Sequence, residues 1–473
     1  MSSNECCCNA GAASAGAAGA TGTAQGAAAD ALVVEEPLIR GMHLDTALLH
    51  GGKTDPIKPD STTPPIYQTS AYEYKDAEQH ALVCQGRAAG FVYTRLGNPT
   101  VAAFERQMAA LEGGVAAVAT ASGMAATFDA VTNIVRAGDH IVCAATLYGG
   151  TIEMFENLRD FGIDTTYVPA CTVDELAEVV DERTRIIFAE TLSNPKLEVL
   201  DIAAVAAFAH ERGIALIVDN TVATPYLCRP LDLGADLVVE SSSKYINGHG
   251  NGISGVVIDG GHGPWRDPAH ATLYPAFAKW KKFGPMAFVA KMRAGIFHNA
   301  GACLAPQNAF MNCMGLETLS VRMERACANA KALAEFFEAS GLVTEVRYPG
   351  LASDEGHAVA ERQFGGRGFG AMVAIRVGSQ ERAWKMIDAL KIPLRVSNIG
   401  DTKTLVCHPA STIFCEISPE EQRAAGVFDD SIRISVGIED ARDLVADFKQ
   451  ALEAADAGAG DGAGADGADG AGA

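Results

Sequence analysis

Residues 215–250 read ALIVDNTVATPYLCRPLDLGADLVVESSSKYINGHG, and this stretch decides the fold. Two short apolar runs, 215–218 and 237–240, predict strands, and the first is followed directly by Asp219. Neither run alternates with polar residues, as a strand exposed on one face would. Continuous apolar strands are typical of a parallel sheet that is covered by helices on both faces.

The same alternation of apolar runs and amphipathic segments extends upstream to residue 115. It predicts strands over 115–120, 140–145 and 185–190, and helices over 124–135, 151–161 and 202–211. The sequence therefore predicts an α/β fold with a mostly parallel, doubly wound sheet. Ligands bind such sheets outside the carboxyl ends of the strands. The polar residues that end or follow these strands are Ser122, Tyr148, Asn194, Asp219, Ser241 and Lys244.

The character of the chain changes after Lys291. A long helical stretch is expected over 299–339, and strands over 371–377, 404–407 and 431–435 indicate a smaller α+β domain. We expect five parts. They are a disordered Ala/Gly tail at 1–35, an extended arm at 36–95, a large domain at 96–290, a C-terminal domain at 291–452 and a disordered tail at 453–473.

Composition excludes several classes of protein. The chain has 473 residues, 48% of them hydrophobic, and a formal charge of −21. This acidity argues against nucleic-acid and anionic-membrane partners. We see no long apolar span and no signal peptide, so we expect a cytoplasmic protein. The 12 cysteines form no CxxC pair, and Cys6–Cys8 lacks companions for a site, so no metal is expected.

Lys244 is the first candidate for chemistry. It stands among hydroxyls in SSSKYINGHG (241–250), where burial at a strand end would lower its pKa and favour Schiff-base chemistry. The Ser241 and Ser243 hydroxyls can bind phosphate oxygens. Asp219 can keep a pyridine nitrogen protonated, as a carboxylate does in pyridoxal-phosphate (PLP) enzymes. Taken alone, Lys244 could be a surface lysine and Asp219 a helix N-cap.

Two further strand ends carry features of a cofactor site. TASGMAA (120–126) joins a strand to a helix with small residues, which presents backbone N–H groups to a phosphate. Tyr148 offers a ring that can stack on a cofactor and a hydroxyl that can handle protons. A simple cap and a core tyrosine are the alternatives for these two features.

With these residues in place, the chain resembles the Cys/Met-metabolism PLP enzymes of fold type I over residues 44–452. The resemblance lies in YTRLGNPT (93–100), SGM (122–124), ETLSNP (190–195), Asp219 and Lys244. It implies a PLP-dependent transferase that binds small-molecule substrates and forms a homotetramer with active sites shared within dimers.

The resemblance also implies a role for each site residue. Lys244 forms the Schiff base and acts in catalysis, with Asp219 on the ring nitrogen and Tyr148 stacked on the ring. Asn194 lies near the cofactor's 3′-oxygen, and Arg433 binds the substrate α-carboxylate, a pairing that suits a guanidinium. The expected phosphate ligands are Ser122, Gly123, Met124, Ser241 and Ser243, with Tyr93 and Arg95 from a neighbouring subunit.

Within the family, three stretches are similar to O-acetylhomoserine sulfhydrylases: 283–319, SNIGD (397–401) and HPAST (408–412). Asn398 in the second is expected to bind substrate. The resemblance therefore implies conversion of O-acetyl-L-homoserine and sulfide to L-homocysteine and acetate. Typical methionine γ-lyases have a cysteine where this chain has Gly150. The chain departs from the family's common residues at four places: Val222 replaces a Phe, Glu240 a His, Ser243 a Thr, and Ile413-Phe414 a Thr-His pair.

Three alternatives remain at this level. A γ-lyase acting on methionine, homocysteine or cystathionine would share every cofactor residue. A catalytically inactive PLP-binding regulator would not require the catalytic residues together. A nicotinamide dehydrogenase is disfavoured because GGRGFG (365–370) does not match the Gly-x-Gly-x-x-Gly spacing and precedes a strand.

Overall fold

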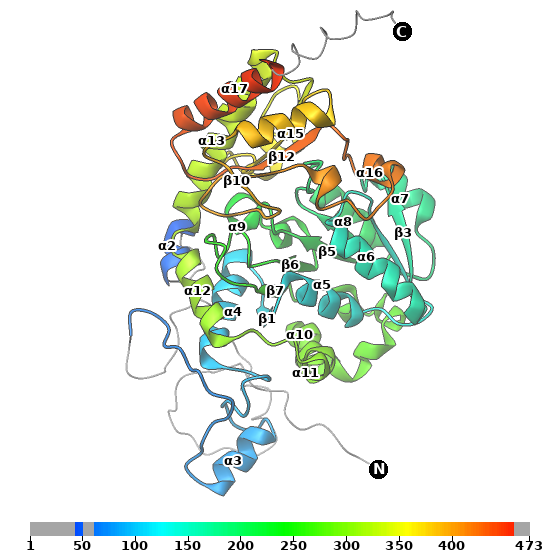
Figure 1. The fold of residues 1–473 in the computed structure, drawn as a ribbon. Helices are drawn as coiled ribbons and strands as arrows, with labels where there is room; N and C mark the ends of the chain where they lie inside the picture. The colour runs from blue at the N-terminus through cyan, green and yellow to red at the C-terminus, as the bar shows by residue number, and fades with distance from the viewer. Residues whose placement is uncertain (1–42, 51–60, 458–473) are drawn as a thin grey trace, which may run out of the picture.

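The computed structural model describes residues 43–50 and 61–457. The predicted tail at 1–35, with Cys6–Cys8, lies outside the described residues, as does most of the tail predicted at 453–473. The described chain forms a large unit around one sheet and a smaller unit around a second sheet, with the smaller unit at the top of Figure 1.

The large unit is built on a seven-stranded sheet with the order β1-β7-β6-β5-β4-β2-β3. Neighbouring strands run parallel from β6 through β3, whereas β7 is antiparallel to both β6 and β1. The strands are β1 (Ala116–Thr120), β2 (His140–Ala144), β3 (Asp164–Val168), β4 (Thr184–Glu190), β5 (Ala215–Asp219), β6 (Leu237–Glu240) and β7 (Gly255–Asp259). This arrangement confirms the predicted mostly parallel sheet.

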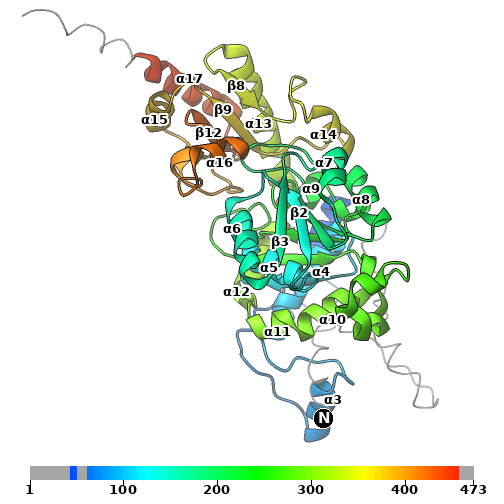
Figure 2. The same ribbon diagram turned by 90° about the vertical axis from the view of Figure 1, so that its right-hand side faces the viewer.

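Helices cover both faces of this sheet, and Figure 2 shows α6 and α8 on opposite sides of β2 and β3. Several begin at capping side chains: Asn98 precedes α4, Ser122 precedes α5 and Asp201 precedes α8. The helices of the arm and the large unit are α2 (Leu44–His50), α3 (Ala77–Cys84), α4 (Pro99–Glu112), α5 (Gly123–Thr132), α6 (Gly149–Leu158), α7 (Val173–Val179), α8 (Ile202–Glu211), α9 (Thr224–Leu227), α10 (Ala287–Ala294), α11 (Ile296–Ala300) and α12 (Pro306–Leu316).

The smaller unit has a five-stranded sheet with the order β10-β11-β12-β9-β8. Its strands are β8 (Glu345–Arg347), β9 (Met372–Arg376), β10 (Leu394–Arg395), β11 (Leu405–Cys407) and β12 (Ser431–Ser435). Its helices are α13 (Leu319–Ser340), α14 (His357–Gln363), α15 (Gln380–Ala389), α16 (Pro419–Ala424) and α17 (Ala441–Ala457). This mixture of helices and mainly antiparallel strands matches the expected α+β C-terminal domain.

The change from one core to the other falls inside α13, later than the boundary expected at residue 291. Met292 and Met323 still belong to the large core, whereas Leu333 and Phe337 belong to the second core. The helical stretch expected over 299–339 is divided into the end of α11, α12 and α13. One long helix therefore joins the two cores. No helix in the described residues is long and apolar enough to cross a membrane.

Candidate active site

Lys244 lies in the turn that follows β6, and its side chain is partly buried. Its Nζ donates a hydrogen bond to Asn398 Oδ1, from the loop between β10 and β11 of the smaller unit. Burial lowers the pKa of Lys244, and the positive charge of Arg433 lowers it further. An ε-amine with a lowered pKa is more often neutral, which is the form that attacks a carbonyl carbon.

The loop that carries Asn398 is held against the Lys244 turn by close backbone contact. Gly400 has a φ of +79°, and a Cβ placed on it would lie 2.5 Å from the backbone nitrogen of Tyr245. The Gly400 N–H also donates to the Ser435 hydroxyl at 3.0 Å. Glycine is therefore required here both for its positive φ and for the missing side chain.

Asp219 and Glu190 form a pair of acidic side chains at the ends of two neighbouring parallel strands. The two residues are directly opposite in the β4–β5 register. Burial raises the pKa of Asp219 to about 6, although its Oδ1 accepts the Thr221 N–H at 2.8 Å. Burial and the charge of Asp219 together raise the pKa of Glu190. A cation bound beside Asp219 would offset the unfavourable free energy of burying negative charge at this place.

Glu190 also holds the segments that carry Tyr148 and Asn194. Its Oε1 accepts the Tyr148 N–H at 2.7 Å, and its Oε2 accepts the Asn194 N–H at 3.2 Å. The sequence places Glu190 in the ETLSNP segment but predicts no role for it. The signal available in the sequence is an acidic residue at the end of an apolar strand, whereas its pairing with Asp219 is visible only in the structure.

The start of α5 lies against the Ser241 end of β6. The Ser122 hydroxyl caps α5 by accepting the Ala125 N–H at 3.1 Å. A Cβ on Gly123 would lie 2.6 Å from the Ser241 Cβ, so glycine permits the close approach of the two segments. Free N–H groups at a helix start attract an anion, and this one is flanked by two serine hydroxyls.

One predicted phosphate ligand, Ser243, already has hydrogen-bond partners within the chain. The Ser243 hydroxyl donates to the Ser254 carbonyl at 3.0 Å and accepts the Ser254 N–H at 2.9 Å. It would have to give up the first bond in order to donate to a phosphate.

The Met124 sulfur and the Tyr148 ring both lie against Gly150, and the Tyr148 side chain is 48% exposed. The ring is therefore accessible to a ligand.

Arg433, on β12, is buried and connects the two remaining predicted residues. Its Nη1 donates to Asn194 Oδ1 at 3.2 Å, and its Nη2 donates to the Asn398 carbonyl at 3.0 Å. Its Nε has no hydrogen-bond partner among the described residues. A buried guanidinium that still has a donor to satisfy is suited to bind a carboxylate.

Tyr93 and Arg95 stand apart from this group. The Arg95 Nη1 donates to the His298 carbonyl at 2.6 Å, and the guanidinium lies 5.7 Å from the centroid of the Tyr93 ring. Within the described part of the chain, neither side chain is hydrogen-bonded to a site residue named above. Tyr93 is 43% exposed. Their expected contact with a neighbouring subunit therefore stays a prediction.

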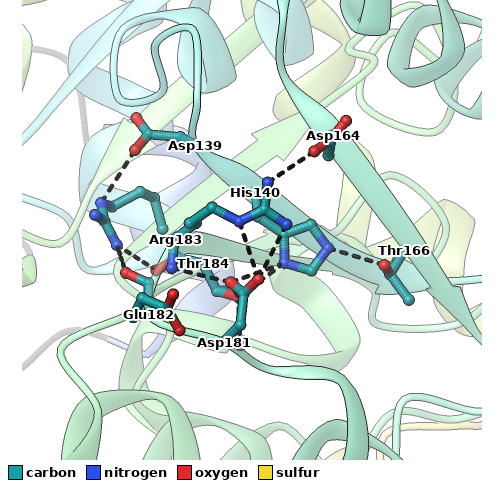
Figure 3. Close-up of polar contacts among 9 residues, drawn as sticks. Asp139, His140, Asp164, Thr166, Asp181, Glu182, Arg183 and Thr184 are labelled. Atoms are coloured by element: carbon teal, nitrogen blue, oxygen red, sulfur yellow. Dashed lines mark hydrogen bonds and ion pairs between the residues drawn. The ribbon is translucent and has the colours of Figure 1, made fainter.

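A second polar cluster lies at the opposite, amino-terminal end of the parallel strands (Figure 3). There His140 Nδ1 is 2.9 Å from Thr184 Oγ1, and Nε2 is 2.9 Å from Thr166 Oγ1. Arg183 joins Asp164 and Asp181 nearby, at 2.8 Å and 3.1 Å. Burial lowers the pKa of His140, and both ring nitrogens have partners. The cluster therefore ties β2, β3 and β4 together and is separate from the Lys244 site.

Residues 45–453 match the model of the Cys/Met metabolism PLP-dependent enzyme family. The chain belongs to this family. It is 41% identical to the sulfhydrylase FUB7 of Fusarium oxysporum f. sp. lycopersici, over 87% of this chain and 98% of that protein. It is 40% identical to the O-acetyl-L-homoserine sulfhydrylase of Leptospira meyeri, over 88% of this chain and 98% of that protein.

A solved structure agrees with this membership. The putative O-acetylhomoserine (thiol)-lyase of Campylobacter jejuni is 34% identical, with a TM-score of 0.80 over 87% of this chain and 100% of that chain. That structure contains a pyridoxyl-lysine monophosphate. The expected fold type I is confirmed, and the chain is a PLP-dependent enzyme.

The residues of this family member suit PLP. Asp219 is a partly buried carboxylate at the end of β5, and its raised pKa indicates that a cationic partner would stabilise its charged form. The start of α5 offers N–H groups beside Ser122 and Ser241 for a phosphate. Lys244 supplies an amine with a lowered pKa for the cofactor's aldehyde.

Proposed function

We propose that the protein converts O-acetyl-L-homoserine and sulfide to L-homocysteine and acetate by replacing the group on Cγ. The observation that carries this proposal is the meeting of three side chains from two units. Asn398 accepts from Lys244 Nζ with its side-chain oxygen and from Arg433 Nη2 with its backbone oxygen. An amino acid whose carboxylate is bound by Arg433 would therefore have its α-carbon close to Lys244.

The relatives make sulfide the preferred nucleophile. Proteins named sulfhydrylase or homocysteine synthase share 39–41% identity with this chain over most of its length. A protein named L-methionine gamma-lyase, from Fusobacterium nucleatum subsp. polymorphum, is 39% identical. We therefore keep the γ-lyase as the alternative that the substrate test must exclude.

We assign the proton transfers to this chain's own residues. Bound PLP supplies an electron sink that acidifies the C–H bonds next to the substrate nitrogen. The Lys244 amine removes the proton from Cα and, with help from the Tyr148 hydroxyl, a proton from Cβ as the Cγ–O bond breaks and acetate leaves. Sulfide then forms the new bond to Cγ, and Lys244 and Tyr148 return the protons to Cβ and Cα. Asp219 keeps its charge at the ring nitrogen throughout. Because burial and the charge of Arg433 lower the pKa of Lys244, its amine gives up a proton more readily and can both accept and return one.

The remaining residues position the reactants. Arg433 fixes the substrate carboxylate with two parallel hydrogen bonds, and Asn398 holds the loop that closes over Lys244. Asn194 accepts a hydrogen bond from Arg433, and with PLP bound it would lie near the cofactor's 3′-oxygen. We assign the phosphate to Ser122, Gly123, Met124, Ser241 and Ser243, with the Tyr148 ring stacked on the cofactor.

Purified enzyme offered O-acetylhomoserine with sulfide is expected to form homocysteine faster than it releases 2-oxobutyrate from methionine alone. Faster 2-oxobutyrate release would favour the γ-lyase, and no turnover of either substrate would favour the inactive regulator. Lys244→Ala is expected to abolish turnover and the absorbance band of the lysine-bound cofactor. Persistence of that band would contradict the role of Lys244.

We further propose a cytoplasmic homotetramer in which Tyr93 and Arg95 complete the site of a neighbouring subunit. The support is the exposure of Tyr93 and the separation of both residues from their own chain's site. Mixing an Arg95→Ala chain with a Lys244→Ala chain should restore activity, because a hybrid dimer then contains one intact site. Two inactive variants that stay inactive when mixed would argue against sharing.

A further inference from the structure

Glu112, at the end of α4, and Glu240, at the end of β6, bury their carboxyl groups against each other. The two residues are 0% and 1% exposed, and each carboxyl group acts on the pKa of the other. Glu112 Oε1 accepts the Asn220 amide at 2.7 Å. Glu112 Oε2 and both Glu240 oxygens have no hydrogen-bond donor as a partner among the described residues. Two carboxyl groups can form a hydrogen bond only if one of them carries a proton.

The groups around Glu112 and Glu240 favour a state in which the two carboxyl groups hold one proton between them rather than none. Arg229 is the cation whose charge reaches Glu112, but its Nε lies 3.2 Å from Asp232 Oδ2, so Asp232 already neutralises it. The charge of Asp219 acts on Glu240 from the neighbouring strand β5. The buried Cys228 thiol also faces Glu112, and the charge of Glu112 contributes to its raised pKa. Two ionised carboxylates would therefore meet without a free counter-charge.

The pair is connected to the cofactor site through Asn220. The Asn220 Nδ2 also donates to the Cys228 carbonyl at 2.9 Å, and its Oδ1 accepts from the Thr191 hydroxyl at 2.8 Å. Asn220 directly follows Asp219, and Asp219 pairs with Val239 in the β5–β6 register. Successive side chains of a strand point to opposite faces, so Glu240 lies on the face opposite Asp219. The pair therefore contacts the end of β5, through Asn220, on the face of the sheet opposite Asp219.

We propose that Glu112 and Glu240 share one proton and act as a positioning pair for Asp219. The pair places a single negative charge behind the residue that faces the cofactor ring, and it fixes Asn220 at the end of β5. Glu240 is one of the positions where this chain departs from the histidine common in the family. The inference rests on the cofactor site and not on the substrate, so its failure would leave the proposed reaction intact.

The first test detects the proton directly. The infrared spectrum of the holoenzyme should contain the carbonyl stretch of a protonated carboxyl group that is lost in Glu240→Gln. In that variant the amide donates to an ionised Glu112. Glu361→Gln, an exposed change on α14, is the matched control and should leave the band in place. If Glu240→Gln does not fold, Glu240→His provides the same loss with the residue common in the family.

The second test measures the effect on the cofactor. Glu240→Gln leaves the pair with the same single negative charge, whereas Glu112→Gln combined with Glu240→Gln removes that charge and makes a protonated, lysine-bound cofactor less favourable. The pH midpoint of its absorbance change should therefore move to lower pH in the double variant and stay unchanged in Glu240→Gln and in Glu361→Gln. Loss of the carboxyl band in Glu240→Gln, together with a downward shift in the double variant, would support the proposal. Retention of the band in Glu240→Gln, or an unchanged midpoint in the double variant, would overturn it.

Discussion

Replacing Asp219 with Asn should stabilise the cofactor-free protein at neutral pH while weakening its hold on PLP. Burial raises the pKa of Asp219 from 3.8 to about 6. At about 1.4 kcal/mol per pH unit, this difference corresponds to about 3 kcal/mol. The folded state binds the proton more tightly than the unfolded state. The stability that the Asp219 carboxyl group contributes is therefore complete below about pH 4, and this contribution is lost as the pH rises through about 6.

Asparagine carries no charge in either state, so the variant avoids this loss. Its amide oxygen can still accept the Thr221 N–H, which keeps the local geometry. Urea unfolding of the cofactor-free protein should show an advantage for Asp219→Asn that grows by about 3 kcal/mol between about pH 4 and pH 8. Asp388→Asn, an exposed change on α15, is the control. A difference between wild type and Asp219→Asn that stays constant with pH would refute the reasoning.

Two further variants test the substrate and phosphate ends of the site. Arg433→Lys keeps the charge but loses the paired donors, and kcat/KM for O-acetylhomoserine should fall ~10–100-fold in steady-state assays. An unchanged kcat/KM would place the substrate carboxylate elsewhere. Gly123→Ala inserts a methyl group 2.6 Å from the Ser241 Cβ, so equilibrium dialysis should detect weaker PLP binding. Gly149→Ala is the control, because its Cβ would make only an ordinary contact at 3.8 Å. Equal PLP affinity in the two variants would contradict a phosphate site between the start of α5 and Ser241.

The sequence pattern predicted the convergence of the site better than it predicted the outline of the fold. Apolar runs found β5 and β6, and the rule for parallel sheets then placed Asp219 and Lys244 at one edge. The run DTTYV of β3 is half polar, and apolarity alone could not reveal it. The run GVVID of β7 is apolar, but nothing in its residues specifies that it pairs antiparallel to both neighbours.

The parts of the site that come from distant segments could not be derived from periodicity. Arg433 and Asn398 reach Lys244 only because the smaller unit packs against the Lys244 turn, and the family resemblance supplied that expectation. The role of Glu190 depends on its register with Asp219, and the Glu112–Glu240 pair depends on how α4 crosses the sheet. Register and helix packing are tertiary properties that a single sequence does not display.

The two sides of the site carry opposite charges, and this arrangement orients both the cofactor and the substrate. On the side of the smaller unit, Arg433 attracts a carboxylate, and its charge adds to the effect of burial in lowering the pKa of Lys244. On the sheet side, the carboxyl groups of Asp219, which is partly buried, and Glu190, which is buried, attract a cation. A ring with a protonated nitrogen would face the sheet, and a substrate carboxylate would face β12. The Lys244 amine, whose pKa is lowered by burial and by the charge of Arg433, is the group that would accept and return the proton.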